Sequence, residues 1–228
     1  MVLKVLMKGL KIKMNIKLNL NIFLFVLLFF ITNQLEIYAL VMLFALIHEL
    51  AHLICGVLLG FKPNTLKIMP LGFCIEFDTK PQDYNIKVLK SNYLSVKKIL
   101  IALAGPLINS LIIIFGIILE LEVNIIFSNL IIILFNLIPI YPLDGGRILQ
   151  NILKILFGNK TAYKYTNIIS NVFIIIITMI SSVLILVTEN IAILILIIIL
   201  WILVIKENKR YNTYNKIYKV IDKNYNYL

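Results

Sequence analysis

The sequence H-E-L-A-H at residues 48–52 lies in an apolar run, residues 37–59, that is long enough to cross a lipid bilayer. On a helix, His48 and His52 project from one face about 6 Å apart along the axis, so both can bind one metal ion. Glu49 can then act as general base toward a water that the metal activates. These are the chain's 2 histidines. The stretch therefore predicts zinc-dependent hydrolysis within a membrane.

An alternative interpretation is that these side chains are polar residues packed in the core of a helical bundle. An ionisable side chain near the middle of a bilayer costs roughly 2.5 to 3.5 kcal/mol. His48, Glu49 and His52 fall within one such run, and this cost favours a functional site over simple packing.

Composition predicts an all-α polytopic membrane protein, because 61% of the 228 residues are hydrophobic. Residues 1–206 form the predicted transmembrane domain. Residues 207–228 form a short polar cytoplasmic tail, expected to associate with the membrane surface or to remain disordered. About six spanning helices are expected, near the lengths that a bilayer requires, at residues 18–32, 37–59, 99–119, 123–140, 168–187 and 191–205.

The net charge of +11 is distributed by topology. All 22 Lys and Arg lie in segments 1–17, 60–98, 141–167 and 206–228, whereas the short connections between the other spans contain four acidic residues and no Lys or Arg. The positive-inside rule then places both termini and the two long loops in the cytoplasm. No small-residue cleavage site follows the first apolar run, which indicates an uncleaved first span. No basic cluster or motif for nucleic acid is visible.

A catalytic zinc normally takes three protein ligands, and the chain has no third histidine. Asp144 is the favoured third ligand, because it follows Pro139 and Pro142, which must interrupt the fourth span near its cytoplasmic end. A helix-ending turn capped by Asp144 is the alternative interpretation. Rival ligands are acidic or thiol side chains, namely Glu76, Asp78 and Cys55, although Cys55 is better explained as a buried structural thiol.

The cytoplasmic loop after the second span predicts a short β-hairpin. Residues 65–69 and 73–77 flank a Pro-Leu-Gly turn, and the second of them alternates apolar and polar residues. The edge of such a hairpin could add an extended substrate segment as another strand, or the hairpin could simply cover the site from lipid.

Three ordered motifs resemble those of the site-2 protease family of intramembrane zinc metalloproteases. They are H-E-L-A-H at residues 48–52, A-G-P-L-I-N at residues 104–109, and N-L-I-P-I-Y-P-L-D-G-G at residues 136–146. The predicted size and topology are most similar to the bacterial stage IV sporulation branch, which processes a membrane-associated sigma-factor precursor. With about 22 residues after the last expected span and a longest loop of about 38, neither the soluble nucleotide-sensing domain nor the inserted PDZ domain of some relatives is expected in this chain.

The resemblance implies that His48, His52 and Asp144 hold one zinc ion and that Glu49 activates water. It implies that Asn136 and Pro142 hold the substrate or stabilise the transition state. Gly105 and Pro106 are expected instead to permit close helix packing.

The implied substrate is a membrane-associated protein. The implied location is a bacterial cell membrane or a membrane around the forespore, and an inhibitory membrane partner or a homo-oligomer is compatible with the resemblance. A zinc or proton-linked transporter is the alternative function, because intramembrane His, Glu and Asp also mark ion pathways.

Overall fold

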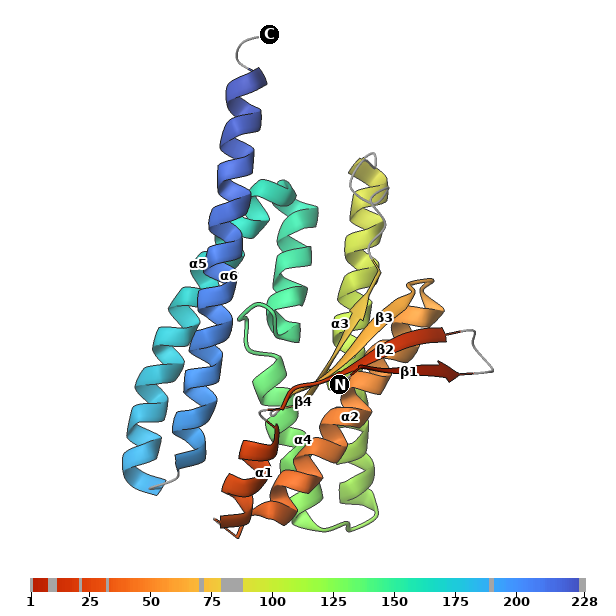
Figure 1. The fold of residues 1–228 in the computed structure, drawn as a ribbon, viewed down its shortest axis with the longest axis vertical. Helices are drawn as coiled ribbons and strands as arrows, with labels where there is room; N and C mark the ends of the chain where they lie inside the picture. The colour runs from red at the N-terminus through yellow and green to blue at the C-terminus, as the bar shows by residue number, and fades with distance from the viewer. Residues whose placement is uncertain are drawn as a thin grey trace. The chain divides into compact units, whose positions relative to one another are not determined.

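A computed structural model describes residues 2–7, 12–20, 22–31, 33–69, 72–78, 88–188 and 191–225 (Figure 1). The chain divides into two units. The first comprises Met1–Tyr93 and Leu100–Asn136, and the second comprises Leu94–Ile99 and Leu137–Leu228.

The first unit contains a four-stranded sheet with the order β1-β2-β3-β4. Its strands are β1 (Val2–Met7), β2 (Ile12–Leu18), β3 (Pro63–Met69) and β4 (Gly72–Phe77). Strands β2 and β3 pair in parallel, whereas the other pairs are antiparallel. A parallel pair needs a long crossover, and here the crossover contains helices α1 (Ile22–Ile31) and α2 (Leu35–Leu58).

The predicted hairpin after the second span is confirmed as β3 and β4, but the expectation of an otherwise all-α chain is wrong at the N-terminus. Residues 12, 14, 16 and 18 are apolar and alternate with Lys and Asn, which is a strand pattern. Leu18 ends β2, and α1 has 10 residues. Such a helix rises about 15 Å, half of a bilayer's hydrocarbon core, so a first span over 18–32 is not confirmed.

The other helices of the first unit are α3 (Val88–Ile118), of which Leu94–Ile99 group with the second unit, and α4 (Val123–Asn136). Helix α4 ends before the two prolines that were expected to interrupt it, four residues short of the expected end of the fourth span at residue 140.

Three helical segments of the described residues are long and apolar enough to cross a membrane, namely Leu35–Leu58, Asn92–Ile118 and Asp144–Val187. Val123–Asn136 is a shorter apolar helix. The protein is therefore an integral membrane protein, although a count of six spans is not confirmed.

The second unit is built mainly from α5 (Asp144–Thr188) and α6 (Ile191–Tyr225). Helix α5 is interrupted at Gly158, which has φ 78° and ψ 172°. Beyond this interruption the two helices contact each other, and Ile174 of α5 and Leu200 of α6 are fully buried. Asn171 and Asn208 also exchange side-chain hydrogen bonds of 3.1 and 2.9 Å.

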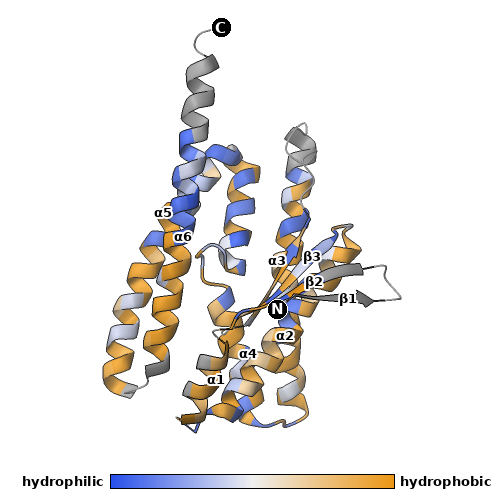
Figure 2. Cartoon of the chain, in the orientation of Figure 1, coloured by the Kyte–Doolittle hydropathy of each residue, from blue (hydrophilic) through white to orange (hydrophobic). Residues whose placement is uncertain are grey.

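Both helices of this pair are hydrophobic over one part and hydrophilic near the interruption (Figure 2). Helix α6 continues without a break past residue 206, where the polar tail was expected to begin. Residues 207–225 are therefore helical, so the expectation of disorder is wrong for them, and association of the tail with the membrane surface stays a prediction.

Candidate metal centre

The two histidines of the first unit lie one helical turn apart on α2 and are removed from solvent. His48, Glu49 and His52 are 4%, 8% and 2% exposed. The two imidazole rings stand edge to face, with centroids 4.7 Å apart and an interplanar angle of 86°. Buried polar groups are costly unless they are hydrogen-bonded, so the partners of these rings determine what the site can bind.

A chain of hydrogen bonds fixes the orientation of His48. The carbonyl oxygen of Ile125 can only accept, and Asn129 Nδ2 donates to it at 2.8 Å. Asn129 Oδ1 therefore accepts from Asn109 Nδ2 at 2.9 Å, and Asn109 Oδ1 is left to face His48 Nδ1 at 2.9 Å. Nδ1 of His48 must then carry the proton, which makes Nε2 the lone-pair nitrogen of the neutral ring.

His52 reaches the same state through one backbone contact. Its Nδ1 lies 2.6 Å from the carbonyl oxygen of Ile101 on α3, and this oxygen can only accept. Nε2 of His52 is consequently also the lone-pair nitrogen of its neutral ring. A metal-binding histidine typically donates its other ring N–H to such an acceptor, and this contact sets both its tautomer and its orientation.

The two Nε2 atoms converge on the backbone of Gly105. A Cβ atom at this position would lie 2.5 Å from Nε2 of His48 and 2.5 Å from Nε2 of His52. No side chain fits at such distances. The expectation that Gly105 permits close approach is confirmed, and the groups that approach are the metal-binding edges of both histidines.

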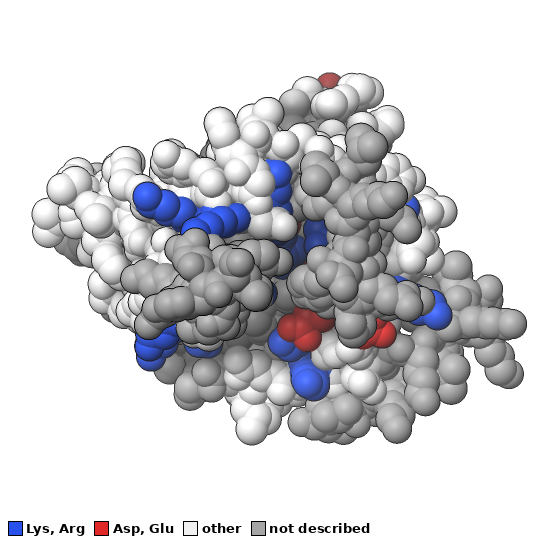
Figure 3. Space-filling model, turned by 90° about the horizontal axis from the view of Figure 1, so that it is seen from above, with Lys and Arg blue, Asp and Glu red and all other residues white. Residues whose placement is uncertain are grey.

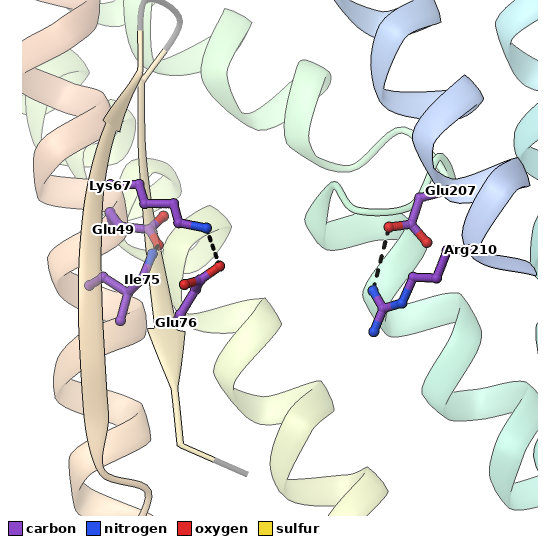
Figure 4. A network of polar contacts seen from close by, with 6 residues as sticks. All are labelled: Glu49, Lys67, Ile75, Glu76, Glu207 and Arg210. Carbon is purple, nitrogen blue, oxygen red and sulfur yellow. Dashed lines mark hydrogen bonds and ion pairs between the residues drawn. The ribbon is translucent and has the colours of Figure 1, made fainter. Parts of the chain in front are cut away.

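Glu49 points toward the sheet rather than along α2. One oxygen of its carboxylate accepts a short hydrogen bond from the backbone N–H of Ile75 in β4 (Figure 4). Strand β4 is the last strand of the sheet, so this contact joins the motif helix to the sheet edge.

The rival ligands lie elsewhere. Glu76 is exposed and forms an ion pair with Lys67 across the hairpin (Figure 4). Asp78 is also exposed. Among the described residues that could hold a metal ion, the group of three is His48, His52 and Asp144, and it excludes Glu76, Asp78 and Cys55.

Asp144 is buried at the first residue of α5 in the second unit, 4% exposed. The positive end of a helix dipole stabilises a carboxylate there, and Arg147 Nη1 lies 3.8 Å from Asp144 Oδ1. The preceding loop folds back over this turn. A Cβ at Gly145 would lie 2.1 Å from the carbonyl oxygen of Leu137, and one at Gly146 would lie 2.4 Å from the carbonyl carbon of Ile140. The two glycines therefore allow the loop to pack directly on the helix that begins with Asp144.

The remaining predicted site residues flank this loop. Asn136 is the last residue of α4 and is half-buried, and its Nδ2 donates to the carbonyl oxygen of Ile132 at 3.0 Å. Its Oδ1 and second amide hydrogen are not used in that bond. Pro142 lies between α4 and α5 and is half-buried.

The residues fit a zinc ion. Histidine nitrogen and carboxylate oxygen are common zinc ligands, and His48, His52 and Asp144 could hold one metal ion. The converging lone pairs of the two Nε2 atoms support this fit independently.

Two functional residues were not assigned a role from the sequence. Asn109 and Asn129 are both 0% exposed and orient His48. Asn109 lies within the A-G-P-L-I-N motif, and Asn129 is an amide in the middle of the mainly apolar helix α4. Polar residues within membrane spans usually face the protein interior, so the position of both asparagines within apolar runs could have indicated a functional role.

Comparisons with known proteins agree with this geometry. Residues 118–180 match the model of peptidase family M50. The chain is 27% identical over 150 residues to zinc metalloprotease MJ0392 of Methanocaldococcus jannaschii, covering 60% of this chain and 39% of that protein. It is 28% identical over 128 residues to stage IV sporulation protein FB of Bacillus subtilis, covering 52% of this chain and 41% of that protein.

Among solved structures, the site-2 protease from Methanocaldococcus jannaschii matches with a TM-score of 0.63 and 22% sequence identity, over 91% of this chain and 95% of that chain. The fold is therefore that of a site-2 protease. The resemblance to this family of intramembrane zinc metalloproteases, predicted from the motifs, is confirmed by the family M50 match and by both curated relatives. The matches span about two fifths of the length of those relatives, 39% and 41%.

Proposed function

We propose that the protein is an intramembrane zinc endopeptidase that cleaves a membrane-tethered regulatory protein near the cytoplasmic side. The proposal rests on the convergence of both histidine Nε2 atoms on Gly105. The buried Glu49, next to His48 in the sequence, supplies a base. The hydrogen bonds at both Nδ1 atoms support it, because they hold the rings in the state that binds a metal.

In this proposal His48, His52 and Asp144 hold the zinc ion. When bound, zinc acts as a Lewis acid that polarises the scissile carbonyl and makes water more acidic. Glu49 accepts a proton from the attacking water on a carboxylate oxygen as the water oxygen bonds to the carbonyl carbon. It then returns that proton to the amide nitrogen as the C–N bond breaks. The burial of Glu49 keeps bulk water away from these transfers.

Asn136 and Pro142 are proposed to act on the substrate. An asparagine amide can donate to the oxygen on which charge develops, and such donors lower the barrier of acyl transfer. Pro142 is proposed to hold the loop before Asp144 in the shape that receives the substrate.

The substrate must present an extended peptide bond, because a helix uses its carbonyls in its own hydrogen bonds. Strand β4 is an edge strand, and Glu49 lies against it at Ile75. We infer that an extended substrate segment pairs with this edge, which would bring its backbone toward the proposed base.

The substrate class is inferred to be a membrane-associated transcription-factor precursor, with a sigma-factor precursor in sporulation as the first candidate. Similarity to stage IV sporulation protein FB supports this choice. Cytoplasmic termini, inferred from the segregation of Lys and Arg, would place cleavage on the side where such a factor acts.

The test compares the native protein with Glu49→Gln, co-expressed with candidate tethered transcription factors. The substitution keeps the side-chain shape but removes the base, so cleavage should fall by at least the ~10²-fold typical of losing a general base, with zinc content unchanged. Glu36→Gln, in the exposed first turn of the same helix, is the matched control and should cleave normally. Cleavage by Glu49→Gln would overturn the mechanism, and zinc flux into vesicles that survives in Glu49→Gln would favour a transporter.

Asn136→Ala separates binding from chemistry in the same assay. It should retain zinc and Glu49 and show slow residual cleavage, because only transition-state stabilisation is lost.

A further inference from the structure

The hydrophilic end of the α5–α6 pair contains a pocket that the proposed chemistry does not use. The pocket is small and partly open to solvent. All of its lining residues belong to the second unit, and they include Tyr163, Thr166, Glu207, Arg210 and Tyr214. The pocket is therefore described entirely within one unit.

Two tyrosine rings that line the pocket each contact a cationic side chain. Tyr163 and Tyr214 stack with centroids 5.1 Å apart and an interplanar angle of 22°. Lys154 Nζ lies 4.8 Å from the centroid of Tyr163, and Arg210 Cζ lies 5.7 Å from that of Tyr214. Stacked rings of this kind hold an ammonium and a guanidinium at fixed positions.

Positive charge exceeds negative charge at this end of the unit. Lys154 and Arg210 both lie over its aromatic rings. The acidic residue lining the pocket is Glu207, whose Oε1 accepts from Arg210 Nη1 at 3.5 Å (Figure 4). Arg210 also hydrogen-bonds to Tyr214, but an arginine carries five N–H donors, so these two contacts leave donors for a further acceptor. Lys and Arg side chains are exposed at several places on the face seen from above (Figure 3).

One buried donor in the pocket lining has no partner within the described part of the chain. Thr166 is 2% exposed, and its Oγ1 makes no hydrogen bond to any described group. A threonine within a helix commonly bonds to the carbonyl four residues earlier, as Thr178 does to Ile174 at 2.7 Å. Leaving a buried hydroxyl unsatisfied is costly, so a ligand that accepts from Thr166 would be stabilised.

We propose that this pocket binds the phosphate group of a phosphate ester. Phosphate offers several acceptor oxygens and a negative charge, which match the guanidinium of Arg210 and the hydroxyl of Thr166 in the pocket lining. Lys154, outside the lining but over the ring of Tyr163, adds positive charge nearby. Apart from Ser170, the lining comes from segments 141–167 and 206–228, which the distribution of Lys and Arg assigns to the cytoplasmic side. Basic pockets between membrane helices on that side bind the head groups of anionic lipids.

The site does not depend on the protease activity proposed above, since none of its residues belongs to the metal centre. Binding is measured on the full chain in nanodiscs as the shift of the thermal unfolding midpoint, Tm. One arm uses phosphatidylcholine discs titrated with glycerol phosphate, and the other uses discs with increasing phosphatidylglycerol. A ligand that binds only the folded state raises Tm, and the rise grows with the logarithm of the ligand concentration once this exceeds the dissociation constant. Stabilisation in the second arm alone identifies a lipid head group, and stabilisation in the first arm identifies a soluble phosphate ester.

Arg210→Gln should weaken the apparent affinity about tenfold or more, and Thr166→Val about fivefold, because each loses a hydrogen bond to a charged ligand. Thr166→Ser keeps the hydroxyl and should bind normally. Lys209→Gln removes an exposed charge beside Arg210, outside the pocket lining, and should also bind normally. The proposal is overturned if neither probe raises Tm, if Lys209→Gln loses as much affinity as Arg210→Gln, or if Thr166→Val binds like the native protein.

Discussion

The histidine pair of α2 and the pocket of α5 and α6 both bury polar side chains within apolar helices, but they satisfy them differently. At the histidines, a chain of donors and acceptors runs from a backbone carbonyl through Asn129 and Asn109 to His48. In the pocket, Thr166 Oγ1 has no partner among the described groups. The first region is organised before its ion arrives, whereas the second has a donor available for a ligand. Substitutions should therefore act in opposite directions at the two places.

The largest effect is expected from removing a zinc ligand. The native protein should hold about one zinc per chain, and His48→Ala or Asp144→Ala should lose most of it, because an open catalytic site has only three protein ligands. Metal content of the purified protein, measured by mass spectrometry, tests this. Glu76→Gln should retain zinc, since Glu76 pairs with Lys67 instead. Full zinc retention in Asp144→Ala would place the third ligand elsewhere.

A second substitution removes no ligand at all. Gly105→Ala places a Cβ where both Nε2 atoms lie, so the histidines must move apart, and cleavage should fall by roughly the 10²-fold that a misplacement of about 1 Å can cost. Gly116→Ala on the same helix is the matched control. Its Cβ would come no nearer than 3.3 Å to another atom, Ile126 Cγ1, so this side chain needs to move only slightly. Equal activity of the two variants in the cleavage assay would show that the histidines do not need the space above Gly105.

A smaller loss should follow when the chain of amides is cut. Asn109→Ala removes the acceptor from His48 Nδ1 and should weaken zinc affinity about 10- to 100-fold, the usual effect of losing such a partner. Asn109→Asp keeps an acceptor there and should recover most of the affinity. Competition with a chelator measures both variants. Native affinity in Asn109→Ala would contradict the proposed fixing of the tautomer.

The sequence predicted the chemistry better than the path of the chain. Two of the signals are local patterns that can be recognised in a short stretch of sequence, namely the spacing of His48 and His52 and the interrupted segment before Asp144. Both occur in the order in which they stand in the family motifs. The strands at the N-terminus were missed because their lysines were interpreted as topology signals, although residues 12–18 also alternate with period two. The roles of Asn109 and Asn129 depend on contacts 61 and 20 residues apart, and spacing along a single helix cannot show such contacts.

The smallest effect is expected in the pocket and should have the opposite sign. Without phosphate or anionic lipid, Thr166→Val replaces an unsatisfied hydroxyl with a methyl group of similar size and should stabilise the protein by about 1 kcal/mol. Asn129→Leu should destabilise it, because Asn109 then loses its acceptor. Thermal unfolding in phosphatidylcholine discs compares the two. A lower Tm for Thr166→Val would mean that the hydroxyl already has a partner.

The hydrogen bond from Ile75 to Glu49 also protects the sheet. An exposed strand edge presents N–H groups that can pair with any other chain, and natural proteins usually block such edges with lysine, proline or a bulge. Here a carboxylate accepts the N–H at the position where a foreign carbonyl would dock. We therefore expect the side chain proposed to move protons also to hinder aggregation through β4, and a segment that pairs at Ile75 must first displace it.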